Sequence, residues 1–163
     1  MNFARYVTFA ALLLSVVGSS LPARAQNNKQ VISGTFYEDQ ASGVATAQAL
    51  LLKFVQTPAN KFLNITNVNC NITTALSEVV ADVRVQTGSV SGGNDLGRDH
   101  SIRGTLSPET GSVYKYYGIS NNAVYFKLGP GRYPSIYIST PTASAGSLFT
   151  AATCYIVGDL SDY

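Results

Sequence analysis

The sequence predicts an all-β protein, an antiparallel β-sandwich of the jelly-roll type with about nine short strands. Three observations lead to this prediction. Short runs of alternating apolar and polar residues recur along the chain, turn residues such as Gly, Pro and Asn separate them, and no long amphipathic helix pattern is present. Many short strands divided by turns are typical of two sheets that pack their apolar faces together.

The alternation of apolar and polar residues is cleanest in residues 77–86. Valine and alanine occupy one face there, and mostly polar residues, Glu78 among them, occupy the other. Residues 31–37 predict the first strand, with Gly34 at a bulge or a close backbone approach, and residues 38–43 predict a turn-rich link. We expect the first and last strands to pair, since their Gly-containing polar patterns match. The other strands are expected at 46–55, 62–73, 101–106, 113–119, 124–128, 135–139 and 149–160.

The central stretch of the chain predicts a hairpin. Residues 57–61, TPANK, have the composition of a tight turn, because proline presets φ and asparagine tolerates the left-handed region. We therefore expect the strands at 46–55 and 62–73 to pair around this turn. Good helix formers between residues 41 and 55 leave a helix open as an alternative there. Strand is favoured because the run leads directly into the turn.

A β-bulge is predicted near Thr66 and Asn67. Apolar residues alternate up to Ile65, and the alternation resumes at Val68 after an odd step. An extra residue at this point places the apolar residues from Val68 onward on the same core-facing side as those before it. Cys70 therefore points into the core only if the bulge forms.

Cys70 and Cys154 are the only cysteines. In an exported protein two cysteines are expected to pair, because the compartment is oxidising. We predict a disulfide between them that links the two sheets across the sandwich.

Residues 1–25 have the pattern of a secretory signal peptide. Arg5 precedes a short apolar run at 9–17, and Ala23-Arg24-Ala25 matches a cleavage site. The apolar run is too short for a transmembrane helix. We expect residues 26–163 to form a single β-sandwich domain that does not span a membrane. The signal peptide is bacterial in type, so we expect a secreted or periplasmic protein of a Gram-negative bacterium.

The composition argues against nucleic acid as a partner. The formal charge is +2, and removal of Arg5 and Arg24 with the signal peptide would make it neutral. Charged residues make up 12% of the chain, against about 25% in a typical domain. The surface must be built largely from Ser, Thr, Asn, Gln and Tyr, which suits uncharged ligands.

Motifs of the common enzyme classes are missing from the sequence. It has one histidine and no H-E-x-x-H, G-x-S-x-G, P-loop or G-x-G-x-x-G pattern. We expect that the protein is not an enzyme and that it binds no cofactor and no metal. The one charge-dense segment offers a candidate cation site at Asn94, Asp95 and Asp99. A hydrolase in which Asp99 orients His100 ranks last among the functions considered.

Several tyrosines are predicted to face solvent. If the apolar residues of the later strands point inward, the outward residues are Tyr125, Lys127, Tyr137 and Tyr155. On 113–119, either Tyr114 and Tyr116, or Lys115 and Tyr117, face outward. On neighbouring strands such residues would form an aromatic platform for a ligand. The alternative is that they only stabilise the sheet by pairing across strands.

From this pattern we expect a non-enzymatic protein that binds a neutral ligand such as a glycan. The alternative is a structural or accessory subunit of a cell-surface assembly, whose partner is another protein. The sequons at Asn64 and Asn71, both N-I-T, are interpreted as strand residues rather than glycosylation sites.

Overall fold

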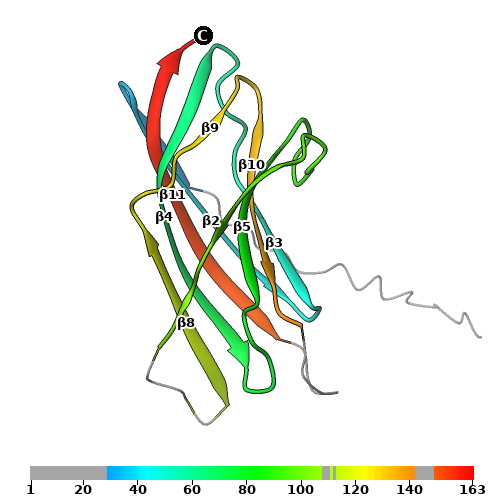
Figure 1. The fold of residues 1–163 in the computed structure, drawn as a ribbon. Helices are drawn as coiled ribbons and strands as arrows, with labels where there is room; N and C mark the ends of the chain where they lie inside the picture. The colour runs from blue at the N-terminus through cyan, green and yellow to red at the C-terminus, as the bar shows by residue number, and fades with distance from the viewer. Residues whose placement is uncertain (1–28, 108–110, 112, 142–148) are drawn as a thin grey trace, which may run out of the picture.

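The computed structural model describes residues 29–107, 111, 113–141 and 149–163. In these residues the chain forms 11 strands in two antiparallel sheets and no helix (Figure 1). The larger sheet contains β1 (Lys29–Ser33), β2 (Phe36–Ala45), β11 (Thr150–Asp162), β4 (Lys61–Ala75), β8 (Tyr114–Asn121), β7 (Thr105–Leu106) and β9 (Phe126–Leu128). The smaller sheet contains β3 (Ala49–Lys53), β10 (Tyr133–Ser139), β5 (Asp82–Gly88) and β6 (Arg98–Ile102).

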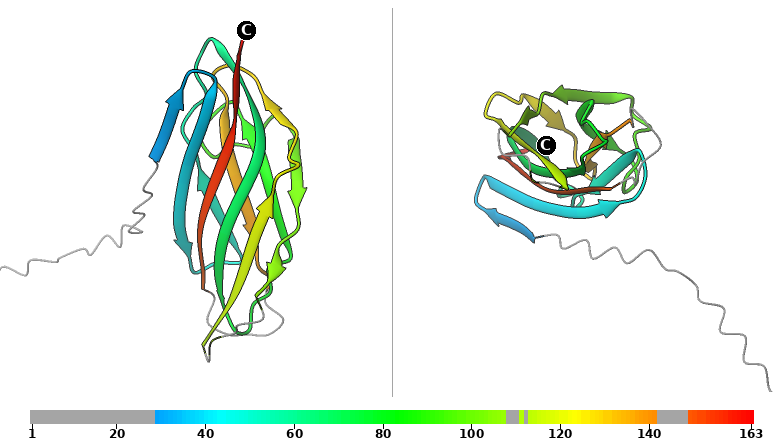
Figure 2. Two further views of the ribbon diagram at one scale, coloured as in Figure 1. Left: turned by 90° about the vertical axis from the view of Figure 1, so that its left-hand side faces the viewer. Right: turned by 90° about the horizontal axis from the view of Figure 1, so that it is seen from below.

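The order of the strands is that of a jelly roll. The chain passes repeatedly from one sheet to the other, and the strands lie in the orders β2-β11-β4-β8 and β3-β10-β5-β6. Figure 2 shows the larger sheet face-on in its left view, with β11 and β4 at its centre. The predicted all-β sandwich is confirmed.

The core lies between the two sheets and is mostly aliphatic, with a few aromatic residues and the two cysteines. The strands that face the core contribute alternate residues, so their remaining side chains stay on the outer face. Full burial of one such side chain stabilises the fold by about 1.5–3 kcal/mol. Fully buried examples from both sheets are Leu52, Leu63, Ile65, Ile72, Ile136, Ile138 and Ile156. Any binding surface of this sandwich must therefore be sought on an outer face, at an edge or at an end.

The predicted bulge at Thr66 is present. Ile65 pairs with Gly158 and Asn67 pairs with Val157, so Thr66 is the extra residue between them. Ile65 and Val68 are both buried, as the odd step required. The Thr66 carbonyl accepts a hydrogen bond from the backbone N–H of Val124 at 3.1 Å, in the break between β8 and β9.

The predicted hairpin around residues 57–61 is wrong. β3 pairs with β10 in the smaller sheet, whereas β4 pairs with β11 and β8 in the larger one. The connection instead crosses from sheet to sheet, and Thr57 holds it there. Its Oγ1 donates to the carbonyl of Gly129 at 2.9 Å and accepts the N–H of Arg132 at 2.8 Å. The strand prediction for this region is confirmed over the helix, since β2 and β3 are both strands.

The predicted single strand at 31–37 is wrong, because it is two strands. Gly34 has a φ of 61° and lies in the turn between β1 and β2, so it does not mark a bulge. Residues 38–43 belong to β2 and not to a link. Their strand character was hidden because Asp39, a buried carboxylate, occupies a core-facing position. The predicted pairing of first and last strands holds for β2 and β11.

The strand predicted at 77–86 begins later, at Asp82. Val79, on the predicted apolar face, is 48% exposed, whereas Glu78, on the predicted polar face, is buried. The Glu78 Oε2 atom accepts the N–H groups of Ala75 and Phe149 at 3.2 and 3.0 Å. These two bonds tie the end of β4 to the start of β11, which explains why the carboxylate is buried.

The predicted signal peptide lies outside the described residues. No part of the described chain forms a helix that could cross a lipid bilayer.

Candidate functional site

The outer face of β4 carries a run of asparagines. Leu63, Ile65, Val68, Cys70 and Ile72 face the core, which leaves the side chains between them on the outside. These outward residues include Asn64, Asn67, Asn69 and Asn71. β4 lies inside the larger sheet, so its neighbours on both sides extend this polar surface.

Two rows of uncharged residues cross the larger sheet beside these asparagines. In the first row Asn69 pairs with Tyr155 of β11 and Ser120 of β8, and Tyr155 pairs with Gln40 of β2. The second row runs through Asn71 in the same way. It contains Ser42, Thr153, Asn71, Gly118 and Thr105, on β2, β11, β4, β8 and β7. The first row continues from Gln40 to Lys29 of β1, so its uncharged part runs from β2 to β8.

A depression of about 500 Å³ lies over these rows. We call it the asparagine groove. Its lining residues are Asn69, Asn71, Thr105, Gly118, Ser120 and Tyr155, together with Cys70 and Ile119, whose own side chains point into the core. Gly118 explains the hollow, because a Cβ at this position would have no heavy atom within 4 Å. A larger residue at Gly118 would fill space that is now open to solvent.

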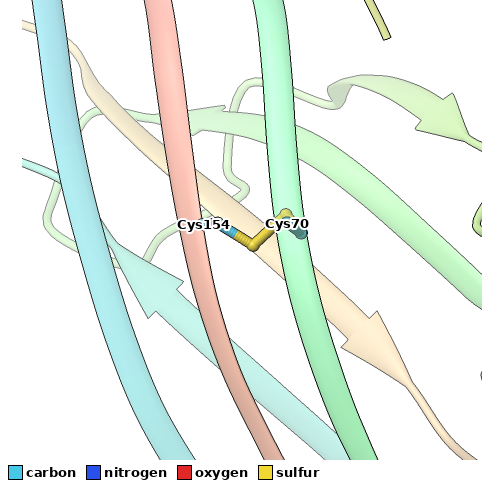
Figure 3. The surroundings of a disulfide bond; sticks show 2 residues. All are labelled: Cys70 and Cys154. Atoms are coloured by element: carbon cyan, nitrogen blue, oxygen red, sulfur yellow. A yellow bond between two sulfur atoms is a disulfide. The ribbon is translucent and has the colours of Figure 1, made fainter. Parts of the chain in front are cut away.

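The disulfide lies directly beneath the groove. Cys70 and Cys154 are bonded and are register partners on β4 and β11, with Cα atoms 4.1 Å apart (Figure 3). The predicted bond is confirmed, but it does not link the two sheets. It joins adjacent strands of one sheet, because the two cysteines occupy facing positions on neighbouring strands. Their outward neighbours, Asn69 with Tyr155 and Asn71 with Thr153, are the middle of the two rows.

The groove is equipped for hydrogen bonding. Each asparagine amide presents two donors and an acceptor, and each hydroxyl can both donate and accept. The half-buried Tyr155 adds an aromatic ring and a further hydroxyl. The lining contains no carboxylate, no histidine and no free thiol. This set of groups matches a neutral, hydroxyl-rich ligand.

The four residues predicted to bind a ligand are not brought together. Tyr155 lines the groove. Lys127 belongs to β9, where it pairs with Asn64 on another part of the outer face, and Tyr125, 80% exposed, directly precedes that strand. Lys127 Nζ lies 4.6 Å from the ring centroid of Phe62, which stacks on Tyr163 at 5.5 Å. Tyr137 belongs to β10 of the smaller sheet, on the opposite side of the sandwich.

The orientation of β8, which the sequence left open, is now known. Tyr117 is buried at 7% exposure, whereas Tyr114 and Tyr116 are 38% and 41% exposed. This is the first of the two alternatives. It places Gly118 on the same outer face as Tyr116, and so in the groove.

The residues of the candidate cation site have separate structural partners. Asp95 closes the loop after β5, where it accepts the N–H and the hydroxyl of Ser89 at 2.8 and 2.6 Å. These hydrogen bonds lower the pKa of Asp95. Asp99 forms an ion pair with Arg84 at 3.3 Å. Asn94 is exposed in the loop, and no cluster of three or more His, Cys, Asp or Glu side chains suited to a metal occurs in the described residues.

The predicted pairing of Asp99 with His100 is not seen. Both residues lie on β6, where adjacent side chains point to opposite faces of the sheet. Asp99 pairs with Gln86 on the outer face and His100 with Val85 on the core side.

Asp39 is a buried carboxylate that holds the two sheets together. Its oxygens accept the N–H groups of Gln40 and Val55 at 2.8 Å each, and the hydroxyl of Tyr37 at 3.4 Å. Burial raises the pKa of Asp39, and the donated hydrogen bonds offset part of this rise. Burial also raises the pKa of Tyr37. The network joins β2 to the segment after β3, so its role is structural.

Sequence reasoning missed most of the groove. Asn69, Asn71, Thr105, Gly118 and Ser120 were not predicted as site residues, although the spacing N-V-N-C-N in residues 67–71 shows that the asparagines share a face. What they face depends on β8 and β11, which are distant in the sequence. The sequence matches no protein-family model and no curated protein.

Proposed function

We propose that this protein is an exported, non-catalytic binding protein for a neutral glycan, and that the asparagine groove is its binding site. The observation that carries the proposal is the hollow at Gly118, which is bordered by amides, hydroxyls and one tyrosine and has no charged residue in its lining.

The chemistry of a sugar supports this assignment. Sugar hydroxyls both donate and accept hydrogen bonds, as the amides of Asn69 and Asn71 and the hydroxyl of Ser120 do. The ring of a sugar also has an apolar face that can rest against the ring of Tyr155. Binding sites combine a few polar groups with aromatic surface in this way. A neutral groove avoids the cost of desolvating charged groups.

The disulfide supports the exported setting. Structural disulfides persist in oxidising compartments and are rare in the cytosol. Cys70–Cys154 is buried in the centre of the larger sheet. A bond at this depth is consistent with oxidation during folding outside the reducing cytoplasm.

The proposal is tested by titrating neutral oligosaccharides into ¹⁵N-labelled protein and following the amide shifts. We expect shifts that centre on Asn69, Asn71 and Ser120. Gly118→Leu should weaken binding at least tenfold, because its side chain fills the hollow without meeting existing atoms at Cβ. Tyr137→Ala, on the opposite sheet, is the matched control and should bind like the wild type. Shifts that survive Gly118→Leu would place the ligand elsewhere and reject the groove.

A second candidate function is a subunit of a cell-surface assembly. The observation that favours it is the β1–β2 hairpin at the edge of the larger sheet, where Val31, Ile32 and Phe36 are 40%, 46% and 40% exposed. Exposed apolar edge strands are common sites of strand pairing. Light scattering over a range of concentrations tests it. A monomer at all concentrations, unchanged by Val31→Lys, would argue against self-assembly.

A further inference from the structure

The asparagine groove is longer across the strands than along them. Its lining comes from four strands in a row, β11, β4, β8 and β7, but from only two rows of residues. Strands lie about 4.8 Å apart, so the groove spans about 14 Å across the sheet. Two residues of one face are about 7 Å apart along a strand. The long axis of any ligand that fills the groove therefore runs perpendicular to β4.

Both ends of the groove continue into uncharged polar surface. At one end the rows pass from Tyr155 and Thr153 to Gln40 and Ser42 of β2. At the other end Thr105 is exposed on β7, the last strand of the sheet. Beyond Gln40 the first row reaches Lys29 of β1, two strands away from Tyr155, so the uncharged surface extends as far as β2.

We propose that the groove binds an internal segment of an unbranched, uncharged polysaccharide whose chain crosses β11, β4, β8 and β7. This inference rests on the proposed function and adds the class of glycan. A site for a terminal sugar surrounds its ligand, because it must contact the end group from several sides. An open groove instead contacts successive units from one side and lets the chain run on past both ends.

The middle of the groove is the part held most firmly. Asn69 and Asn71 flank Cys70, and Tyr155 is next to Cys154, so the disulfide fixes these side chains relative to one another. Thr105 lies on a strand of only two residues at the sheet edge. A short ligand should therefore occupy the middle, and only a longer one should reach Thr105.

The test measures affinity against ligand length. The probes are the mono- to hexasaccharides of β-1,4-linked glucose, β-1,4-linked N-acetylglucosamine and α-1,4-linked glucose, titrated by NMR with the full mature chain. We expect the dissociation constant of one series to fall with each added unit and then to level off. Thr105→Ala should weaken hexasaccharide binding about three- to tenfold, the value of one hydrogen bond. It should leave disaccharide binding within about twofold.

The possible failures can be told apart. A monosaccharide that binds at the groove as tightly as its hexasaccharide would overturn this inference and leave the proposed function standing. Equal loss of di- and hexasaccharide binding in Thr105→Ala would also overturn it, because Thr105 would then not be a contact made only by the longer ligand. No response to any of the three series would overturn both the inference and the proposed function.

Discussion

Cys70 and Cys154 are register partners on β4 and β11, with Cα atoms 4.1 Å apart on the core side of the larger sheet. Because they are paired, the outward residues beside them are paired as well. The disulfide thus locks the alignment of Asn69 with Tyr155 and of Asn71 with Thr153. One covalent bond serves both the stability of the sandwich and the geometry of the groove.

Loss of the disulfide should destabilise the protein. The bond closes a loop between cysteines 84 positions apart, so the double variant Cys70→Ala/Cys154→Ala should lose about 2–5 kcal/mol of unfolding free energy. Urea unfolding of the variant measures this loss. Wild-type protein in a reducing buffer is the control for the small cavities that alanine leaves. An unchanged midpoint in both samples would show that the register is held without the bond.

Replacement by alanine should destabilise the fold at one glycine of the larger sheet, Gly158, and have little effect on stability at another, Gly118. A Cβ at Gly158 would lie 2.1 Å from the carbonyl oxygen of Asn64, next to the bulge at Thr66. Gly158→Ala should therefore destabilise the fold by at least about 1–3 kcal/mol. Gly118→Ala, where the space is open, should change stability by no more than about 0.5 kcal/mol. Thermal or urea unfolding compares them, and equal effects would contradict the bulge geometry.

Asp39→Asn should destabilise the protein by about 1–3 kcal/mol. Both oxygens of Asp39 accept backbone N–H groups, those of Gln40 and Val55. The amide nitrogen of asparagine would face one of these donors and leave it without an acceptor. Asp159→Asn, at an exposed position, is the matched control and should stay within about 0.5 kcal/mol of the wild type. Equal unfolding curves for the two variants would refute the role of the network.

The stability contributed by Asp39 should fall as the pH rises. Burial raises its folded-state pKa above 3.8, so the folded protein holds this proton more tightly than the unfolded chain does. The contribution is fully present below pH 3.8 and is lost as the pH rises through the folded-state pKa. The measurement is the unfolding free energy of the wild type minus that of Asp39→Asn at several pH values. If this difference in unfolding free energy grew as the pH rose above 3.8, the predicted direction of the pH dependence would be wrong.

Glu78 should tolerate an amide where Asp39 does not. Only its Oε2 accepts hydrogen bonds, from Ala75 and Phe149, while the buried Oε1 has no hydrogen-bond partner. Glu78→Gln can keep its oxygen at both N–H groups and should cost less than about 1 kcal/mol. Glu78→Ala removes the acceptor and should cost about 1–3 kcal/mol. Chemical unfolding decides, and a glutamine as damaging as alanine would show that the charge itself is required.

Much of the inward and outward pattern was predictable from the chain. Alternation assigned the core faces of β4, β9, β10 and β11 correctly, because successive side chains of a strand point to opposite sides whatever the strand pairs with. The odd step after Ile65 even located the bulge. The pattern failed where polar groups are buried, at Asp39 and Glu78, because hydrogen bonds there offset the cost of burial.

The sequence by itself determined the all-β class, the bulge and the identity of the disulfide partners, since these follow from local periodicity and from the presence of only two cysteines. The tertiary structure alone decided which strands are neighbours. Strand pairing joins residues far apart in the chain through backbone hydrogen bonds that carry no side-chain signature. For that reason the expected hairpin was wrong, the disulfide proved to lie within one sheet, and Tyr137 was separated from Tyr155. For the same reason, the hollow at Gly118 comes to lie beside Asn71.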